Sequence, residues 1–368
     1  MADKAYTPPG RIGNPDMSLA TDPRINPKLL AAIQAFGMAS NQTFELPDNI
    51  SAEDPNPEKL TPLIRDTEDQ MLAIYNNLPN DLAKDSEEPE IAISELTIKG
   101  VDDNDIKLYI HKPAKASGPL PAVLYSHGGG MVYIPTDTRA HRRWLQTLAC
   151  QNLIAIAVDF RNAYASASKT YNPFPAGLND CAAAAKYLHA NRSSLGISKL
   201  ITQGESGGGN LAITTALKAK REGWLDAISG VYASVPYISN AYGWPRERKL
   251  RDLPSLVEND GYLIACDSLA AYGWYYGPQD VENPHAWPYH ESVKNLEGLP
   301  PVHLSMDELD PLRDEGMVFY RKLAQAGVQV TAEVKLGLIH AAEMIMRQAL
   351  PEAHESAARS VAEFARNV

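Results

Sequence analysis

Short apolar runs alternate with helix-like segments throughout the part of the chain that follows Glu90. The runs expected to form strands are residues 91–99, 106–111, 122–125, 153–158, 200–202, 231–233, 302–306 and 328–334. Helix-like segments occupy residues 138–151, 180–191, 207–222 and 315–326. Continuous apolar runs are typical of strands that are buried on both faces, and alternating strands and helices build a mostly parallel sheet. The sequence therefore predicts an α/β fold, with a mostly parallel central sheet of about eight strands and helices on both faces.

The first 90 residues contain no comparable apolar run. Residues 1–27 are rich in proline and polar groups and are expected to form an extended arm, whereas residues 29–38 and 61–82 have the apolar spacing of helices. Residues 236–288 are rich in tyrosine and tryptophan and show no clear strand. An insertion of that length favours a lid or wall over a site. We expect residues 1–90 to form an N-terminal arm and cap helices, and about 236–288 to form a cap or wall within the main domain, residues 91–368.

One serine lies among glycines directly after an expected strand. The G-E-S-G-G segment at residues 204–208 follows the apolar run at 200–202 and precedes a helix-like segment. A serine in this context sits on a sharp elbow above the sheet, and the glycines relieve clashes that side chains would create. A glycine-rich loop that only caps a helix has a similar composition. The order of strand, turn and helix makes Ser206 the candidate nucleophile.

A run of three glycines follows another expected strand. The H-G-G-G segment at residues 127–130 comes shortly after the apolar run at 122–125. Backbone N–H groups of consecutive glycines can point together at an oxyanion, beside the N–H that follows a nucleophile. His127 precedes the serine, and we expect it to tie the glycine loop by hydrogen bonds rather than to act in catalysis.

A serine hydroxyl needs a general base, because it is a poor nucleophile at neutral pH. Of the nine histidines, His340 follows the last expected strand, and Gly337 favours a turn that brings its imidazole over the sheet. The order of serine, acid and histidine along the chain is the one expected for this sheet architecture.

The acid that orients the imidazole is expected in the loop after the strand at 302–306. Four carboxylates crowd this loop: Asp307, Glu308, Asp310 and Asp314. We favour Asp310, which directly precedes a proline, and we expect Asp314 to begin the next helix, where a carboxylate complements the helix dipole. Asp307 and Glu308 are the alternatives.

Three segments together resemble the hormone-sensitive-lipase family of α/β-hydrolases: residues 127–130, 204–208 and 310–316. The similarity spans roughly residues 91–345. It implies an α/β-hydrolase fold with a helical cap, and hydrolysis of carboxylic esters without a cofactor. No metal is expected, because the sequence contains no H-E-x-x-H motif. The resemblance also implies that residues 91–368 are the catalytic domain and that the oxyanion is bound by the N–H groups of Gly129, Gly130 and Gly207.

The substrate is less constrained than the reaction. The elbow carries Glu205 and a third glycine, which is an unusual version of the family pattern, and residues 159–165 and 341–342 also depart from it. The side chains expected to contact substrate are Met131, Glu205, Trp244 and Trp274. A lactone or amide hydrolase, or an acyltransferase, would use the same triad, and a non-catalytic small-molecule binding protein would use the same fold.

Charge and composition exclude several partners. The chain of 368 residues has 45 acidic and 34 basic residues, which give a net charge of -11, so neither nucleic acid nor an anionic membrane surface is an expected partner. No stretch approaches the ~20 apolar residues of a membrane span. The first residues lack a secretory signal. We expect a cytoplasmic protein that binds a small ester, and whether copies of it associate is left open.

Overall fold

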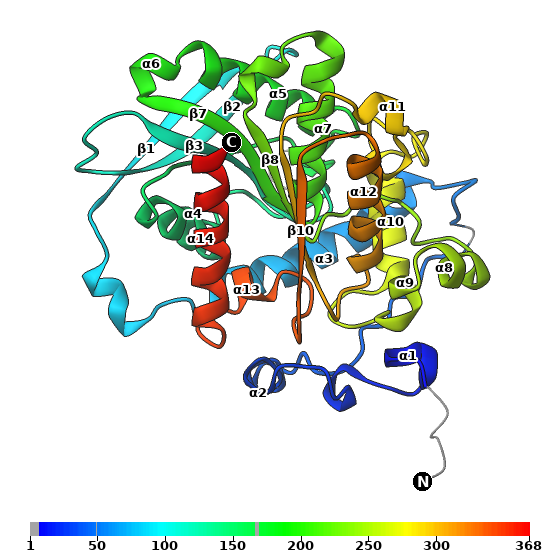
Figure 1. Cartoon of the computed structure of the whole chain (residues 1–368). Coiled ribbons are helices and arrows are strands. Elements are labelled where there is room, and N and C mark those ends of the chain that lie inside the picture. The colour runs from blue at the N-terminus through cyan, green and yellow to red at the C-terminus, as the bar shows by residue number, and fades with distance from the viewer. Residues whose placement is uncertain (1–6, 49, 166–168) are drawn as a thin grey trace.

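The computed structural model describes residues 7–48, 50–165 and 169–368. An eight-stranded sheet forms its centre, in the order β1-β2-β4-β3-β7-β8-β9-β10 (Figure 1). These strands are β1 (Ile91–Lys99), β2 (Asp105–Pro113), β3 (Leu120–Ser126), β4 (Ile154–Val158), β7 (Ile197–Glu205), β8 (Gly230–Ser234), β9 (Val302–Asp307) and β10 (Val330–Lys335). Two short strands, β5 (Tyr164–Ala165) and β6 (Thr170–Tyr171), pair with each other.

The strand pairing confirms the predicted fold class. The strands from β4 to β10 in the sheet run parallel, and β1 and β2 are joined antiparallel at one edge. All five residues of β4 are buried, as expected for a strand covered on both faces. Each of the eight expected apolar runs overlaps one of these strands. The runs at 153–158 and 328–334 begin one and two residues before their strands, β4 and β10, and most of the others are extended by one to three residues at an end.

Helices cover both faces of the sheet (Figure 1). Their bounds are α4 (Arg139–Cys150), α5 (Ala176–Ala190), α6 (Arg192–Leu195), α7 (Gly207–Glu222), α11 (Val293–Leu296), α12 (Arg313–Gln325), α13 (Ala342–Ile345) and α14 (Pro351–Asn367). Neighbouring side chains of β7 contact different layers, because successive residues of a strand point to opposite faces. Gln203 accepts a hydrogen bond from Trp144 of α4, whereas Thr202 donates one to Ala212 of α7.

The described part of the N-terminal region contains three α-helices. Its helices are α1 (Gly10–Gly13), α2 (Pro27–Ala35) and α3 (Pro57–Asn77), so the described part of the predicted arm is not extended throughout, and residues 1–6 lie outside the described residues. Helix α3 starts earlier than expected because the side chain of Asn56 caps it by accepting from Lys59 N–H. It ends before Leu78, whose extended backbone is favoured by the proline that follows.

The aromatic insertion at residues 236–288 is also helical and contains no strand. It holds α8 (Arg246–Asp252), α9 (Ser255–Glu258) and α10 (Cys266–Tyr276). Figure 1 shows α3 crossing below the sheet in that view, and α10 packs against it. The insertion and the N-terminal helices thus meet at the end of the sheet where the parallel strands have their carboxyl ends. Within the described ranges, no helix is long and apolar enough to cross a membrane.

Candidate active site

Ser206 lies on a tight turn between β7 and α7. Its backbone has φ 56° and ψ -120°, a combination that side chains disfavour, and α7 begins at the next residue. Surrounding backbone fixes this conformation, since Ser206 N–H donates to Ser234 O at 3.0 Å. A Cβ at Gly208 would lie only 1.8 Å from Ser126 O, so the turn also needs glycine there. The hydroxyl is thereby held at the end of the sheet on a strained elbow.

The three-glycine loop touches the start of α7 backbone to backbone. Gly129 and Gly130 have φ values of +87° and +63°, and a Cβ at Gly207 would lie 2.5 Å from Met131 N. Among the hydrogen bonds of the described residues, none uses the N–H of Gly129, Gly130 or Gly207. These N–H groups are therefore available to bind an oxygen atom beside Ser206.

His340 contacts one of the four carboxylates of its neighbouring loop. Its Nδ1 lies 2.8 Å from Oδ2 of Asp310, and both side chains are buried. The other three carboxylates bind elsewhere: Asp307 accepts from Ala341 N–H, Glu308 from Gly337 N–H, and Asp314 from Ser255 N–H. Asp314 is in the first turn of α12, as expected.

A cavity of about 310 Å³ brings the candidate residues together. Ser206, His340, Gly129 and Gly130 all line it. Most of the remaining lining is apolar or aromatic and comes from the N-terminal region, from α3 and from the stretch before and within α10. It includes Met38, Phe44, Met71, Ile74, Tyr75, Tyr133, Ile134, Leu263, Ile264, Leu269 and Tyr272.

Three of the expected substrate contacts lie outside this lining. Met131 is buried behind the glycine loop, against the start of α7. Trp274 is buried in the insertion, where its ring faces Gly243, and Trp244 packs under the guanidinium of Arg248 at 3.3 Å from the ring centroid. Contact of Met131, Trp244 and Trp274 with substrate stays a prediction, and the structure places all three outside the lining of the cavity that holds Ser206. Glu205 does line the cavity, with its carboxyl bonded to the glycine loop.

His127 is enclosed by aromatic rings. It stacks on Phe160 at 4.5 Å and on His141 at 5.0 Å, and its Nδ1 lies 2.8 Å from Gly128 O. Burial lowers the pKa of His127 to about 4, so the ring is neutral at neutral pH. It does not line the cavity with Ser206.

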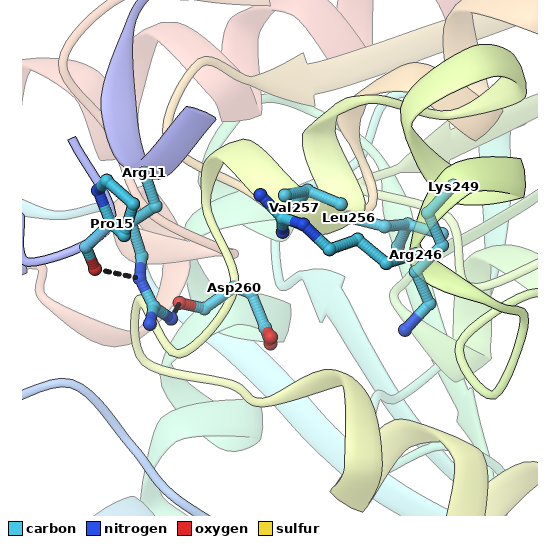
Figure 2. A pocket seen from close by; sticks show the side chains of 7 residues that line it. All are labelled: Arg11, Pro15, Arg246, Lys249, Leu256, Val257 and Asp260. Carbon is cyan, nitrogen blue, oxygen red and sulfur yellow. Dashed lines mark hydrogen bonds between the residues drawn. The ribbon is translucent and has the colours of Figure 1, made fainter. Parts of the chain in front are cut away.

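A second cavity, of about 280 Å³, shares no lining residue with the first. Figure 2 shows Arg11 beside Asp260, with Arg246 and Lys249 on the other side. Arg11 donates to Asp260 O at 2.6 Å. No residue of the serine, histidine and acid set reaches this basic cavity.

Comparison with known proteins agrees with this geometry. A family model described as alpha/beta hydrolase fold matches residues 123–344. A solved structure titled brefeldin A esterase, a bacterial homologue of human hormone sensitive lipase, is 46% identical with a TM-score of 0.93, and the match covers 98% of each chain. The chain belongs to the hormone-sensitive-lipase family of α/β-hydrolases.

Other members of this α/β-hydrolase family are more distant. The structure of esterase Est22 is 33% identical with a TM-score of 0.82, over 95% of this chain and 99% of that one. The carboxylesterase NlhH of Mycobacterium tuberculosis is 29% identical over 289 residues, which are 76% of this chain and 83% of NlhH.

Sequence reasoning missed most of the cavity wall in this hydrolase. Phe44 belongs to an irregular connector, and the apolar side of α3 gave no sign of whether it faces a core or a cavity. The only available signal was that a helix lacking strands of its own must pack on another part of the chain.

Proposed function

We propose that this protein is a serine hydrolase that cleaves carboxylic esters through an acyl-enzyme, with Ser206 as nucleophile, His340 as base and Asp310 as orienting acid. The observation that carries the proposal is the 2.8 Å contact of His340 with Asp310, together with the common cavity of Ser206 and His340. The names of the relatives, which include carboxylesterase and esterase, support the same activity.

In the first step, His340 takes the proton of the Ser206 hydroxyl as the oxygen attacks the ester carbonyl carbon. Asp310, through Nδ1, keeps the imidazole in the required tautomer and stabilises its protonated form. The C–O bond to the alcohol then breaks, His340 gives its proton to the leaving alkoxide, and an ester of Ser206 remains. Water repeats the sequence, so the carboxylic acid leaves and the serine regains its proton.

The negative oxygen of each tetrahedral intermediate would be bound by the N–H groups of Gly129, Gly130 and Gly207. Each such donor is typically worth about 3–4 kcal/mol in the transition state, because it is oriented before charge develops. Their lack of partners in the described structure and the positive φ of both loop glycines support this role.

The wall of the cavity favours a mainly apolar ester. A volume of about 310 Å³, lined largely by aromatic and aliphatic side chains, suits a small or medium acyl or alcohol group. We assign the wall over the catalytic domain to a cap made of residues 1–90 and about 236–288, supported by the packing of α3 on α10.

The test is covalent labelling combined with hydrolysis of p-nitrophenyl esters. A fluorophosphonate probe should modify wild-type protein at Ser206, and Ser206→Ala should lose both labelling and about 10³-fold or more of turnover while keeping its melting temperature. His340→Ala should behave similarly. Unlabelled wild-type protein, or near-wild-type hydrolysis by Ser206→Ala, would favour a binding protein on this fold or a different nucleophile.

A further inference from the structure

The carboxyl group of Glu205 is bonded directly to the glycine loop. The residue is 3% exposed, and its Oε1 accepts hydrogen bonds from Gly128 N–H at 2.6 Å and from Tyr125 O–H at 3.0 Å. Gly128 immediately precedes Gly129, whose N–H is assigned to the oxyanion. One carboxyl oxygen therefore fixes the backbone of the loop from a position next to the nucleophile.

The second carboxyl oxygen of Glu205, Oε2, has no such hydrogen bonds in the described part of the chain. Oε2 is buried and has no hydrogen-bond partner within the described residues, and the same is true of Oε2 of Glu343. Both side chains line a cavity of about 10 Å³, which is close to the volume that one water molecule requires. Buried polar atoms in proteins are nearly always hydrogen-bonded, so two such atoms around one small cavity indicate a shared partner.

Glu343 is tied in turn to the segment that carries His340. Its Oε1 accepts from Lys335 Nζ at 2.5 Å, and Lys335 ends β10. Two residues separate His340 from Glu343, and one of them, Ala341, donates its N–H to Asp307 at 3.0 Å. The buried side chains of Glu205 and Glu343 thus lie between the glycine loop and the segment that carries His340.

We propose that Glu205 is a positioning residue that holds the oxyanion loop through Gly128, and that a single water molecule in the small cavity joins it to Glu343. This inference rests on the proposed function, because it assigns the loop that Glu205 holds to oxyanion binding. Glu205 touches no reacting atom in this scheme and acts through the orientation of the Gly129 and Gly130 N–H groups.

The protonation state of Glu205 fits this role. Burial, with a further contribution from the charge of Glu343, raises the pKa of Glu205 to about 8, so the group is neutral at pH 7. The other titratable groups around it are Tyr75 of α3, Tyr125 of β3 and Tyr232 of β8, and burial raises the pKa of each. His340 lines the larger cavity with it, and Lys335 neutralises Glu343.

In a neutral Glu205, one carboxyl oxygen accepts hydrogen bonds and the other carries the proton and donates one. Oε1 accepts from Gly128 without placing a full negative charge beside the oxyanion. The proton on Oε2 is donated to the bridging water, which donates to the carboxylate of Glu343. An ionised Glu205 would instead oppose the developing negative charge, which is a reason for burying the group.

The central experiment compares Glu205→Ala with the nearly isosteric Glu205→Gln. Glu205→Ala should lower kcat for p-nitrophenyl butyrate about 50-fold or more with KM changed less than about 3-fold, because oxyanion contacts act in the transition state. Glu205→Gln should stay within about 5-fold of wild type, because its amide oxygen still accepts from Gly128. A folded Glu205→Ala with wild-type kcat, or a Glu205→Gln as impaired as Glu205→Ala, overturns the proposal.

The matched control is Asp180→Ala. Asp180 is another fully buried carboxylate that accepts a backbone N–H, from Arg161 at 2.8 Å, and it does not line the catalytic cavity. This variant should lose stability like Glu205→Ala but keep kcat per folded molecule within about 2-fold. An equal loss of kcat in both variants would mean that any buried carboxylate suffices, which contradicts a specific role for Glu205.

Two further measurements test the proposal: a double-mutant cycle, and a hydrogen-exchange measurement that does not depend on ester hydrolysis. A double-mutant cycle of Glu205→Ala and Glu343→Gln tests the water-mediated link, because Glu205→Ala removes the donor to the water; strictly multiplicative effects on kcat would refute it. Hydrogen exchange of the peptide that contains residues 127–130 should speed up in Glu205→Ala even if no ester is hydrolysed, because the acceptor for Gly128 N–H is lost. Unchanged exchange would contradict the positioning role, whereas failure of wild-type protein to react with a fluorophosphonate would count only against the proposed function.

Discussion

His340 Nδ1 lies 2.8 Å from Asp310 Oδ2, while Asp310 Oδ1 accepts the N–H of Leu312 at 2.9 Å. The second contact fixes the plane of the carboxylate, so the imidazole meets an acceptor that cannot rotate away. The pair thus joins two loops, one after β9 and one after β10, that are distant from Ser206 in the sequence.

Replacing Asp310 with Asn should therefore lower kcat about 10³- to 10⁴-fold, because the amide favours the wrong histidine tautomer. Asp307→Asn is the matched control, since the amide oxygen can still accept from Ala341 N–H. Steady-state kinetics on one p-nitrophenyl ester checks both variants. A larger loss in Asp307→Asn than in Asp310→Asn would transfer the role of the acid to Asp307.

Adding a methyl group at Gly207 should separate the glycine loop from α7. Its Cβ would lie 2.5 Å from Met131 N, and the displaced backbone can no longer aim its donors, so kcat should fall about 100-fold. Gly118→Ala serves as the control, because a Cβ there meets no atom within 4 Å. Normal kcat in a folded Gly207→Ala would mean that the loop can shift without loss of function.

Phe44→Ala should broaden the preference for ester size. Phe44 is a half-buried part of the cavity wall, and removing its ring should raise kcat/KM for longer acyl chains relative to acetate. The measurement is a series of p-nitrophenyl esters from acetate to decanoate. Trp274→Ala should leave the ranking of these esters unchanged, although it should lower stability by about 3–5 kcal/mol because it empties a buried site. A shifted ranking in Trp274→Ala alone would reverse the assignment of the wall.

Arg24→Ala should destabilise the protein by about 3 kcal/mol or more, because it leaves the buried carboxylate of Asp22 without its cation and removes one of the two arginines that bind Glu258, which keeps Arg313. Arg24 pairs with Asp22 and Glu258, whose side chains are 0% and 5% exposed. Arg65→Ala, which removes an exposed pair with Asp66, should cost less than about 1 kcal/mol. Urea unfolding of both variants gives the comparison, and equal midpoints would show that the arm contributes little.

Stability should fall as the pH rises from about 6.5 to about 8. Burial raises the pKa of Glu315, like that of Glu205, to about 8. Between the ordinary carboxyl pKa and 8, the folded state binds more protons than the unfolded state, so raising the pH favours unfolding. Burial lowers the pKa of His127 and His354 to about 4, but above about pH 6.5 such histidines are neutral in both states.

The check is the melting temperature at constant ionic strength. Glu315→Gln can keep the acceptor for Ile238 N–H while removing one titrating group, so its melting temperature should fall less steeply with pH. Identical slopes in both proteins would contradict a raised pKa at Glu315.

The sheet could be predicted from sequence because each strand is an apolar run of its own. The last helix, α14, was missed because its buried face consists largely of alanines such as Ala357, Ala358, Ala362 and Ala365, which give a weak apolar pattern. One sequence signal for the start of this helix was present: Pro351 lies in its first turn, where proline is favoured.

The candidate triad residues and the glycine loop could be named from sequence because they stand in fixed order after particular strands. The choice among Asp307, Glu308, Asp310 and Asp314 needed coordinates, because a loop sequence does not state which carboxyl turns toward His340. The cavity wall needed them too: an aromatic residue such as Trp274 is equally suited to a core and to a pocket, and only tertiary packing separates the two.

The contacts of the N-terminal region also determine the stage of folding at which the wall of the catalytic cavity can form. Arg24 binds Glu258, a residue 234 positions further along the chain, and Asn26 N–H donates to Gly337 O, just ahead of His340. Arg24 and Asn26 thus lack these long-range partners until the later parts of the chain have been made. Contacts of such long sequence separation form slowly. The wall of the cavity that includes Phe44 is therefore expected to close last, over a catalytic centre that has already folded.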